Sequence, residues 1–440
     1  MSFKYYSIHL RTPCCLLFLP LTTVFVIGFI MARRAGDLSV AQIPVIQSSH
    51  IQRALELKEK EGGHVVVIGA GASGVSAAYA LEYLGVPYTV LEASGTMGGR
   101  VREMDDFVNL PLDLGAEFIH VMPRVLQDLL LLFDDDDDDD KDDASLIGII
   151  KYQPTTFDVY ARGKRRRRNW MSYFYQEYKF ANTTWWSYFD KFMYPYIADR
   201  VEFNAVVKRI EYMGHDTSIP SNTSMLVTTT DGRKFTASHV ILTVPIPILQ
   251  DRDITFSPDL DAGTWKAVDD MVMADGMKVW FEFDQRFWPD FLFTKSILRG
   301  MEGQPFYFDA LLGKPDANAN VLCLFNVNTN EASKRAAWTD NEIVQNALDQ
   351  LEDMFDRSDL RDHLVQSRVQ NWSQEPHIRG AYTWNYGEYN QKTLRKPLHE
   401  GHLFLAGEHI AKGREYSGTV HGAAVTGREA VLNILETKSR

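Results

Sequence analysis

Three glycines near the start of the globular part of the chain could hold a phosphate group. Gly69, Gly71 and Gly74 form the pattern G-x-G-x-x-G. In this pattern the first glycine makes a tight turn, the second lets the backbone approach a pyrophosphate, and the third lets a helix pack closely on a strand. Backbone N–H groups at the helix start, where Ala72 and Ser73 lie, would bind the phosphates together with the positive end of the helix. The spacing therefore predicts a phosphate-binding loop.

An acidic residue after the next strand extends this prediction to a dinucleotide. Glu92 follows the last of these glycines by 18 residues, with Ala93 beside it, and could accept hydrogen bonds from ribose hydroxyls. A glycine-rich turn without a ligand would not need this acid, and a carboxylate here disfavours a 2′-phosphate. Gly98, Gly99 and Arg100 add a second close backbone approach and a fixed cation, which favours the longer FAD molecule over NAD.

The surrounding sequence predicts the βαβ unit that positions this loop. Residues 64–70 (HVVVIGA) are a continuous β-branched run, as a parallel strand buried on both faces requires. Residues 73–85 have the apolar spacing of a helix that ends at Gly85, and residues 86–93 predict the second strand. An aromatic stretch at 169–200 suits helices whose rings mostly form core. The later elements follow in mixed order without internal repeats: strands within 202–245, at 277–283 and at 321–327, a helix at 340–356 and a final helix from about Gly418.

These motifs resemble the flavin-containing amine oxidase family, which includes monoamine oxidases, polyamine oxidases and histone lysine demethylases. The likeness covers most of residues 64–436 and rests on LDLGAEFIH (112–120), NAVVKRI (204–210), HVILTVPIPIL (239–249), GMKVWFEFDQRFW (276–288), LFLAGEHI (403–410) and SGTVHGAAVTGREAVLNIL (417–435). It implies an α/β fold with a Rossmann-like FAD-binding domain and an interleaved α+β substrate-binding domain. We expect the first at 62–122, 198–256 and 396–440, and the second at 123–197 and 257–395.

The resemblance also implies roles for individual residues. Lys278 would hydrogen-bond through a water to flavin N5, and the backbone of Val207 would contact adenine. Gly407 and Glu408 would bind the ribityl–pyrophosphate part of the cofactor. From residue type alone, a strand-edge lysine that points to solvent would be the alternative for Lys278.

The sequence departs from the monoamine oxidase pattern at two positions beside the flavin. Monoamine oxidases attach the flavin through a cysteine that precedes a cage tyrosine, whereas this chain has Ala381 before Tyr382. We therefore expect non-covalent FAD. The second cage aromatic would fall at Thr419, which with Val420 begins the last helix, so only half of the aromatic sandwich is present. These differences favour the polyamine oxidase side of the family.

Two residues of LGAEFIH would face the substrate. His120 stands where polyamine oxidases carry a His or Glu near the substrate amine, and a neutral imidazole could help keep an amine deprotonated. A buried structural histidine is the alternative. Glu117 adds an anion that a small cationic amine could use.

The implied activity is oxidation of a primary or secondary, polyamine-like amine. The C–H bond next to nitrogen is a poor acid, so a hydride would pass to flavin N5, giving an imine that hydrolyses to an aldehyde, while O₂ takes the electrons and becomes hydrogen peroxide. An L-amino-acid oxidase or lipid desaturase of the same fold is an alternative, although the only arginines available for a substrate carboxylate are Arg100 and Arg102. A non-catalytic membrane-tethered flavoprotein is the alternative from another class, and Lys278, Tyr382 and His120 argue against it.

Composition argues against several other functions. Three cysteines, two of them adjacent, and His residues without ligand spacing predict no metal site. The net charge is -12, of which the nine Asp and one Lys at 134–143 contribute -8, leaving -4 for the rest. We expect that acidic run to be a disordered loop. The one basic run, KRRRR at 164–168, is too small for a nucleic-acid surface.

The N-terminus predicts a membrane segment. Residues 14–32 are uncharged and nearly all apolar, which is long enough for a helix to span a bilayer. We expect a signal anchor or signal peptide at 1–35 and a charged linker at 36–61 that contains a short helical pattern (IQRALELKEKE). The body would then be lumenal or extracellular, and glycosylation would be expected at Asn182, Asn222 and Asn371, which begin N-x-S/T sequons.

Overall fold

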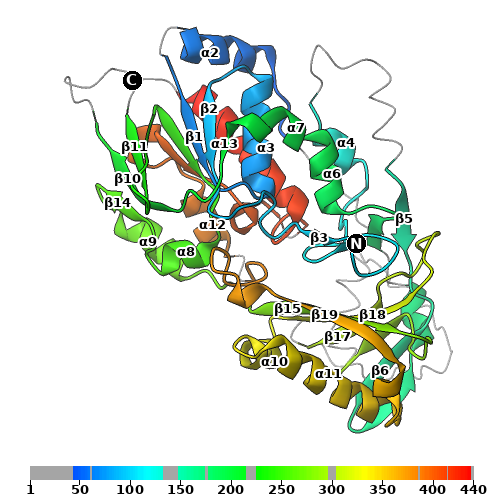
Figure 1. The fold of residues 1–440 in the computed structure, drawn as a ribbon. Coiled ribbons are helices and arrows are strands. Elements are labelled where there is room, and N and C mark those ends of the chain that lie inside the picture. The colour runs from blue at the N-terminus through cyan, green and yellow to red at the C-terminus, as the bar shows by residue number, and fades with distance from the viewer. Residues whose placement is uncertain are drawn as a thin grey trace, which may run out of the picture.

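The computed structural model describes residues 43–59, 62–131, 147–173, 177–214, 224–295, 304–384, 387–413 and 415–437. The predicted membrane segment (1–35), the acidic run (134–143) and the sequon at Asn222 all lie outside these residues. Within the described ranges, no helix combines the length and the apolar character needed to cross a bilayer. Figure 1 shows two lobes, which we call the upper and the lower lobe.

A five-stranded parallel sheet in the order β20-β13-β1-β2-β9 forms the centre of the upper lobe. Alternation along β1 buries both faces, because Val65 and Val67 join one core while Val66 and Ile68 join another. The strands pair in parallel, as the predicted βαβ unit requires. Their bounds are β1 Val65–Ile68, β2 Tyr88–Leu91, β9 Val201–Glu202, β13 His239–Leu242 and β20 Leu403–Leu405.

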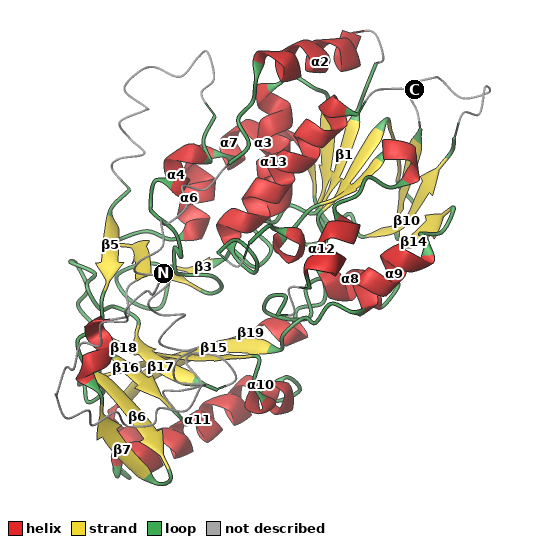
Figure 2. Ribbon diagram, turned by 180° about the vertical axis from the view of Figure 1, so that it is seen from behind, coloured by secondary structure: helices red, strands yellow, loops and turns green. Residues whose placement is uncertain are grey.

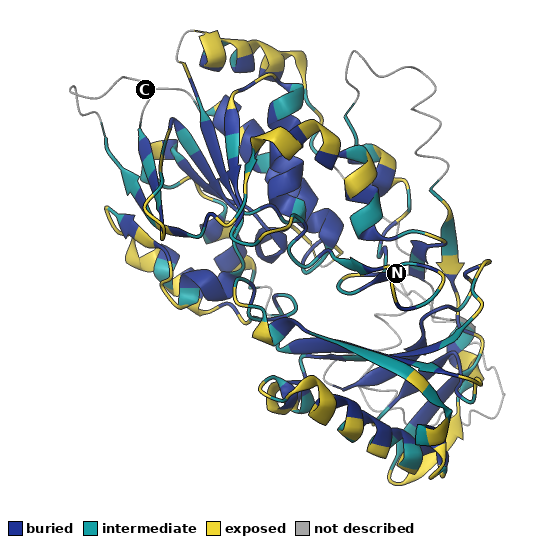
Figure 3. Cartoon of the chain, viewed as in Figure 1, coloured by how far each residue is buried: buried dark blue, intermediate teal, exposed yellow. Residues whose placement is uncertain are grey.

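Two long helices cover one face of this sheet. Helix α3 (Ala72–Tyr83) follows the glycine loop directly, and α13 (Val420–Glu436) packs along it. Figure 3 shows both helices as almost entirely buried. The final helix predicted from about residue 418 is thus confirmed, and it lies against the phosphate-loop helix.

A four-stranded sheet in the order β12-β11-β10-β14 and three short helices enclose the second core of the upper lobe. The predicted strands within 202–245 are confirmed here. These elements are β10 Val207–Tyr212, β11 Met225–Thr229, β12 Lys234–Ala237, β14 Thr255–Ser257, α8 Ile246–Gln250, α9 Ala262–Asp269 and α12 Glu388–Leu394.

The lower lobe is built on a seven-stranded sheet in the order β19-β15-β18-β17-β16-β6-β7 (Figure 2). Helix α11 (Asp340–Phe355) covers one face and begins with a capping box between Thr339 and Glu342. The opposite face, which carries Lys278 and Trp280, is largely aromatic. The strands are β6 Phe157–Ala161, β7 Lys164–Arg167, β15 Gly276–Phe283, β16 Phe291–Phe293, β17 Phe306–Asp309, β18 Asn320–Val327 and β19 Leu364–Asn371.

The second half of the predicted linker at 36–61 forms a helix, which confirms its helical pattern, but this half is not a linker. Residues 48–59 form helix α2 (Ser48–Glu59), which packs on α13. Ala54 and Leu57 are buried in the same core as α3, because the spacing of three residues places both on one helix face. This segment therefore belongs to the folded body.

The aromatic stretch at 169–200 differs from the predicted helices in its first half. It begins with a 3₁₀ turn (Asn169–Tyr173) and strand β8 (Glu177–Phe180), and continues with α6 (Trp185–Phe192) and α7 (Tyr194–Ile197). Strand β8 pairs with β5 (Ile149–Tyr152). The rings of α6 and α7 lie in the same core as α3, so the predicted domain boundary at 197/198 cuts through one core. The remaining short elements are β3 Glu103–Met104, β4 Leu112–Asp113, α4 Val125–Asp128 and α10 Asn330–Arg335.

The structure shows the surroundings of two sequons, at Asn182 and Asn371, and of the basic run at 164–168. Asn371 is buried and its side-chain amide donates to the Ala336 carbonyl, so this sequon offers no glycan acceptor in the folded chain, whereas Asn182 is exposed. The basic run forms the edge strand β7, where Arg165 and Arg167 pair with the buried carboxylate of Asp158. Part of the positive charge of the basic run is therefore neutralised by Asp158 on the neighbouring strand β6.

Buried neutral histidines make the stability of the fold depend on pH. Burial lowers the pKa of His239 to about 3 and the pKa of His409 and His421 to about 4, against about 6.5 in an unfolded chain. Because the unfolded state binds these protons first, their stabilisation is complete above pH 6.5 and is lost as the pH falls toward 4. Urea unfolding between pH 8 and 4.5 should show this decline, and His239→Asn should make it shallower. An unchanged slope in that variant would contradict the assignment.

Candidate active site

One cavity of about 1190 Å³ reaches from the carboxyl ends of β1 and β2 in the upper lobe to β15 and β17 in the lower lobe. All predicted site residues except Gly74 line it. They are Gly69, Gly71, Ala72, Ser73, Glu92, Ala93, Gly99, Arg100, Glu117, His120, Val207, Lys278, Tyr382, Gly407, Glu408, Thr419 and Val420. Residues as far apart in the sequence as Gly69 and Val420 thus line one cavity.

The glycine loop has the geometry that a phosphate requires. Gly69 has φ +101°, which a side chain disfavours. A Cβ on Gly74 would lie 1.8 Å from the Gly69 carbonyl oxygen, so this glycine serves the packing of α3 and not the cavity wall. A Cβ on Gly71 would meet only the Gly98 carbonyl, at 3.8 Å, which leaves the backbone open to the cavity. A pyrophosphate could approach at Gly71 and the start of α3.

Glu92 is buried at the cavity wall and is held by the backbone. Its carboxylate accepts hydrogen bonds from Ala70 N at 2.7 Å, Ser94 N at 2.8 Å and Ser94 Oγ at 2.7 Å. A carboxylate has about four lone-pair positions, so these contacts leave capacity for a hydroxyl donor. The arrangement fits the predicted contact with a ribose.

Arg100 connects the second glycine pair to the C-terminal motif. Its guanidinium donates to Glu408 Oε1 at 2.9 Å and to the Ala381 carbonyl at 2.8 Å. Thr383 Oγ1 donates to the same Glu408 oxygen at 3.0 Å. The cation is therefore fixed in place at the cavity, where it could face an anionic part of a cofactor.

The residues beside the predicted flavin position have clear local functions. Tyr382 lines the cavity with Trp384, and their ring centroids lie 6.5 Å apart. Trp384 is an aromatic wall residue that the sequence reasoning missed. Thr419 caps α13, since its Oγ1 accepts from Gly422 N and donates to the Tyr416 carbonyl. Among the described residues the one cysteine, Cys323, is buried in strand β18, away from position 381.

Lys278 projects from β15 into the base of the cavity and is 3% exposed. Its ammonium donates to the Asp113 carbonyl at 2.8 Å, the Gly115 carbonyl at 3.2 Å and Glu117 Oε2 at 3.0 Å. An ammonium has three N–H donors, so these acceptors match its full capacity. The solvent-facing alternative is excluded, and the predicted water contact toward flavin N5 would require one of these bonds to be exchanged.

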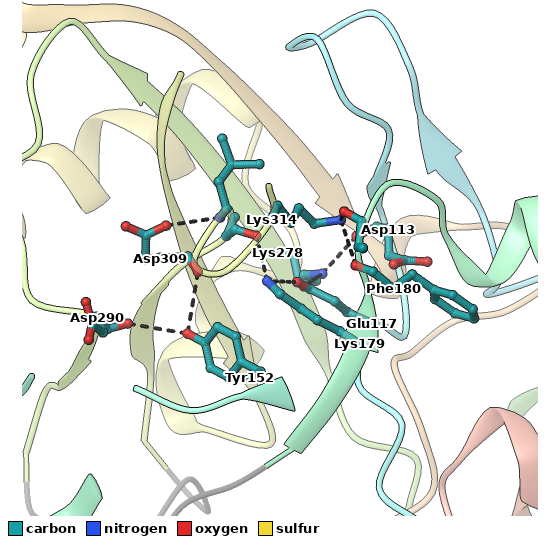
Figure 4. Close-up of polar contacts among 12 residues, drawn as sticks. Asp113, Glu117, Tyr152, Lys179, Phe180, Lys278, Asp290, Asp309 and Lys314 are labelled. Carbon is teal, nitrogen blue, oxygen red and sulfur yellow. Dashed lines mark hydrogen bonds and ion pairs between the residues drawn. The ribbon is translucent and has the colours of Figure 1, made fainter. Parts of the chain in front are cut away.

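Glu117 does not offer the free anion that the sequence suggested. Its second oxygen accepts from Lys179 at 3.3 Å, so two buried ammonium groups share this carboxylate (Figure 4). Burial alone would raise the pKa of Glu117, but Lys278 and Lys179 lower it below the ordinary value. Likewise, burial would lower the pKa of Lys278, yet Glu117 raises it. Glu117 therefore neutralises lysines instead of facing a cationic substrate.

Two more ionisable residues, Asp113 and Lys314, join Glu117, Lys179 and Lys278 in what we call the buried charge cluster. Burial and the nearby Glu117 raise the pKa of Asp113 to about 8. Burial and the nearby Lys179 lower the pKa of Lys314 to about 8. Sequence reasoning missed Lys179 and Lys314, although EYKF at 177–180 carries a signal, since alternate charged residues stand among aromatics in a strand.

His120 pairs with a carboxylate that sequence reasoning also missed. Its Nδ1 lies 3.1 Å from Glu177 Oε2 on strand β8. An isolated antiparallel bridge between Ile119 and Tyr178 places the two residues opposite each other. Four phenylalanines, which we call the phenylalanine wall, also line the cavity: Phe118, Phe306, Phe308 and Phe325. The Phe118 ring lies beside His120, and Lys278 Nζ lies 6.0 Å from the centre of the Phe308 ring.

Known proteins resemble this chain in sequence. The model of the family described as flavin containing amine oxidoreductase matches residues 72–156 and 196–435. The chain is 29% identical over 254 residues to Polyamine oxidase 6 of Oryza sativa subsp. japonica, a match that covers 55% of this chain and 48% of that protein. It is 28% identical over 242 residues to Lysine-specific histone demethylase 2 of Homo sapiens, covering 52% of this chain and 27% of that protein. The chain thus spans about half the length of the polyamine oxidases it matches.

Solved structures share the fold. Cyclohexylamine oxidase from Brevibacterium oxydans IH-35A gives a TM-score of 0.66 at 17% identity, covering 86% of this chain and 100% of that chain. A putrescine oxidase bound to putrescine gives a TM-score of 0.65 at 16% identity, covering 84% and 98%. The predicted α/β fold is confirmed.

The buried position of Glu117 predicts that its replacement acts on stability. Glu117→Gln leaves two buried lysines without their shared carboxylate, so the free energy of unfolding should fall by about 3 to 5 kcal/mol in urea titrations. Adding Lys179→Met should recover part of the loss, because it removes one unmatched charge. Glu375→Gln is the matched control, since that cavity carboxylate pairs with Arg102 and is more exposed. Unchanged stability with weakened amine binding would contradict this role.

Proposed function

Because the chain belongs to the family of flavin containing amine oxidoreductases, whose cofactor is FAD, we propose that it oxidises a primary or secondary, polyamine-like amine with O₂ as electron acceptor. The carrying observation is that the glycine loop, Lys278 and Tyr382 line one cavity. The predicted phosphate-binding loop, the buried ammonium of Lys278 and the ring of Tyr382 therefore face the same cavity. The sequence likeness to polyamine oxidases supports the substrate class.

The chain's residues suit FAD along its length. Gly71 and the start of α3 would hold the pyrophosphate, Glu92 the ribose, and the Arg100–Glu408 pair the adjoining polar part of the cofactor. Bound FAD supplies the hydride acceptor and passes electrons to O₂. With alanine at position 381, the chain would hold it without a thioether bond.

The protein's own contribution to the reaction is position and electrostatics. The phenylalanine wall and Tyr382 would orient the amine and exclude water from its reacting carbon. Lys278 keeps a fixed positive charge at the cavity base, where it would stabilise negative charge that develops during the reaction. The imine would leave the site for hydrolysis to an aldehyde.

The arginines of the cavity disfavour an amino-acid oxidase. Arg100 pairs with Glu408, and Arg102 pairs with Glu375 at 3.0 Å. Both cations that could bind a substrate carboxylate are therefore already matched by protein carboxylates.

Amines should reduce the bound flavin. We expect spermine, N-acetylspermine or tyramine to bleach the visible flavin band without O₂, because each carries an amine next to a carbon-bound hydrogen, and to release hydrogen peroxide in air. L-Amino acids carry the same kind of hydrogen but also a carboxylate, for which neither cavity arginine is unmatched, so they should leave the band unchanged. Bleaching by amino acids alone, or by none of these compounds, would reject the proposed function.

Replacement of Lys278 tests its role in the reaction. Lys278→Met should retain FAD but slow flavin reoxidation by O₂ at least about tenfold, which corresponds to 1.36 kcal/mol of lost transition-state stabilisation. Stopped-flow mixing of reduced enzyme with O₂ measures this rate. Lys266→Met, at an exposed position on α9, is the control. Loss of FAD from the variant at position 278 would assign this lysine a structural role.

A further inference from the structure

His120 and Glu177 form a pair in which His120 lines the cavity and Glu177 lies behind it. The His120 side chain lines the cavity and is 32% exposed, whereas the Glu177 side chain is 3% exposed. The Ile119–Tyr178 bridge, with Ile119 N donating to the Tyr178 carbonyl at 2.7 Å, holds the two backbones in register. Strand β8 is itself fixed by its pairing with β5. The pair is therefore placed by backbone hydrogen bonds on both sides of Glu177.

The contact between the two side chains decides which nitrogen of His120 is available. Glu177 Oε2 lies 3.1 Å from Nδ1, so Nδ1 carries the proton and donates it to the carboxylate. Nε2 then has a free lone pair, and no described residue hydrogen-bonds to it. A carboxylate behind an imidazole fixes its tautomer and orientation and stabilises the imidazolium that forms when the other nitrogen takes up a proton.

The other titratable groups of the site are poor proton acceptors. Lys278 is charged and its three N–H groups are occupied. Glu117 is matched by two lysines, which lower its pKa, and Asp113 is largely protonated at neutral pH because burial raises its pKa to about 8. Among Asp113, Glu117, Lys278 and His120, His120 is thus the residue with a nitrogen that can accept a proton.

The groups around His120 do not place a second positive charge beside it. His421 at the start of α13 is buried, lies 2.9 Å from the Glu415 carbonyl through Nε2, and stays neutral because burial lowers its pKa to about 4. The ring of Phe118 lies next to His120 and carries no charge. Among the described residues around His120 on β8, α13 and its own segment, Glu177 is the carboxylate that contacts the imidazole.

We propose that Glu177 is a positioning residue that makes His120 Nε2 the acceptor of the proton carried by the incoming substrate ammonium. This inference rests on the proposed function, since only the neutral amine can be oxidised. An alkyl ammonium has a pKa near 10, so about one molecule in a thousand is neutral at pH 7. In the step, the N–H bond of the ammonium breaks, its electron pair stays on the amine nitrogen, and the proton bonds to Nε2. The imidazolium that forms is balanced by Glu177.

The pair also separates two charges along the cavity. Strand β8 places Glu177 against His120 and Lys179 against Glu117, two residues apart on the same strand. At the first position, the Glu177 carboxylate contacts the base His120. At the second, Lys179 pairs with Glu117, the carboxylate that also holds Lys278. The substrate nitrogen would therefore lose its proton to His120, while Glu117 keeps the charge of Lys278 matched.

The pH dependence of flavin reduction in the FAD-loaded enzyme tests this role. With spermine or tyramine under anaerobic conditions, the wild-type reduction rate should rise with pH as His120 loses its proton. Glu177→Gln removes the anion that balances the imidazolium, so it should move this rise to lower pH and lower the rate above it. Glu177→Asp keeps the charge and should leave the rise near the wild-type position. In a His120→Gln background, Glu177→Gln should have no further effect on the profile.

A measurement without turnover checks the same assignment. NMR titration of ¹³C-labelled histidine, with the His120 signal identified by His120→Gln, should show the His120 titration shifted to lower pH in Glu177→Gln. Glu352→Gln on α11 removes the same charge outside the cavity and should change neither profile nor titration.

The outcomes separate this inference from the proposed function. If the wild-type flavin is not reduced by any amine, both fall. If it is reduced but Glu177→Gln leaves the profile and the His120 titration unchanged, or acts equally in the His120→Gln background, the proton-acceptor pair is overturned and amine oxidation stands. If Glu177→Gln does not fold, Glu177→Asp provides the test, because it keeps the negative charge. A pH profile of Glu177→Asp that differs from wild type as much as the profile of His120→Gln does would contradict the role of the charge.

Discussion

The carboxylate of Glu117 between the ammonium groups of Lys179 and Lys278 is the interaction on which the active site depends. It joins residues from β8, β15 and the segment after β4, and it lies at the boundary between the two lobes. Removing ions from water costs several kcal/mol each, so such a group persists only when each charge is paired and its remaining hydrogen bonds are made. The carbonyl groups of Asp113, Gly115 and Ala310 provide those bonds.

This arrangement makes strand β8 the link between the folding of the cavity and its chemistry. The strand pairs with β5 on one side and bridges to Ile119 on the other, so the segment 112–120 cannot shift without moving the charged groups on β8. Because side chains alternate along a strand, Glu177 and Lys179 face the same way and reach two different partners. The backbone pairing of β8 thereby fixes the positions of Glu177 and Lys179 beside their partners His120 and Glu117.

The cofactor end depends on a different kind of constraint. At Gly71 and Gly74 the decisive property is the absence of a side chain, which lets α3 approach the loop and leaves backbone N–H groups facing the cavity. The Arg100–Glu408 pair then ties this loop region to the C-terminal motif. Backbone geometry thus governs phosphate binding, while side-chain charge governs the substrate end.

The sequence by itself determined the βαβ unit, the glycine loop, the family and a set of site residues that all line the cavity except Gly74, because these depend on local spacing and on motifs that are contiguous in the chain. It misassigned α2 as a linker and α6 and α7 to the other domain, since apolar spacing indicates a buried face but not the core that receives it. Only the tertiary structure decided that Glu117 is matched by lysines and that Glu177 pairs with His120. The charge state of a carboxylate depends on which groups surround it, and residues 57 to 161 positions away provide those partners.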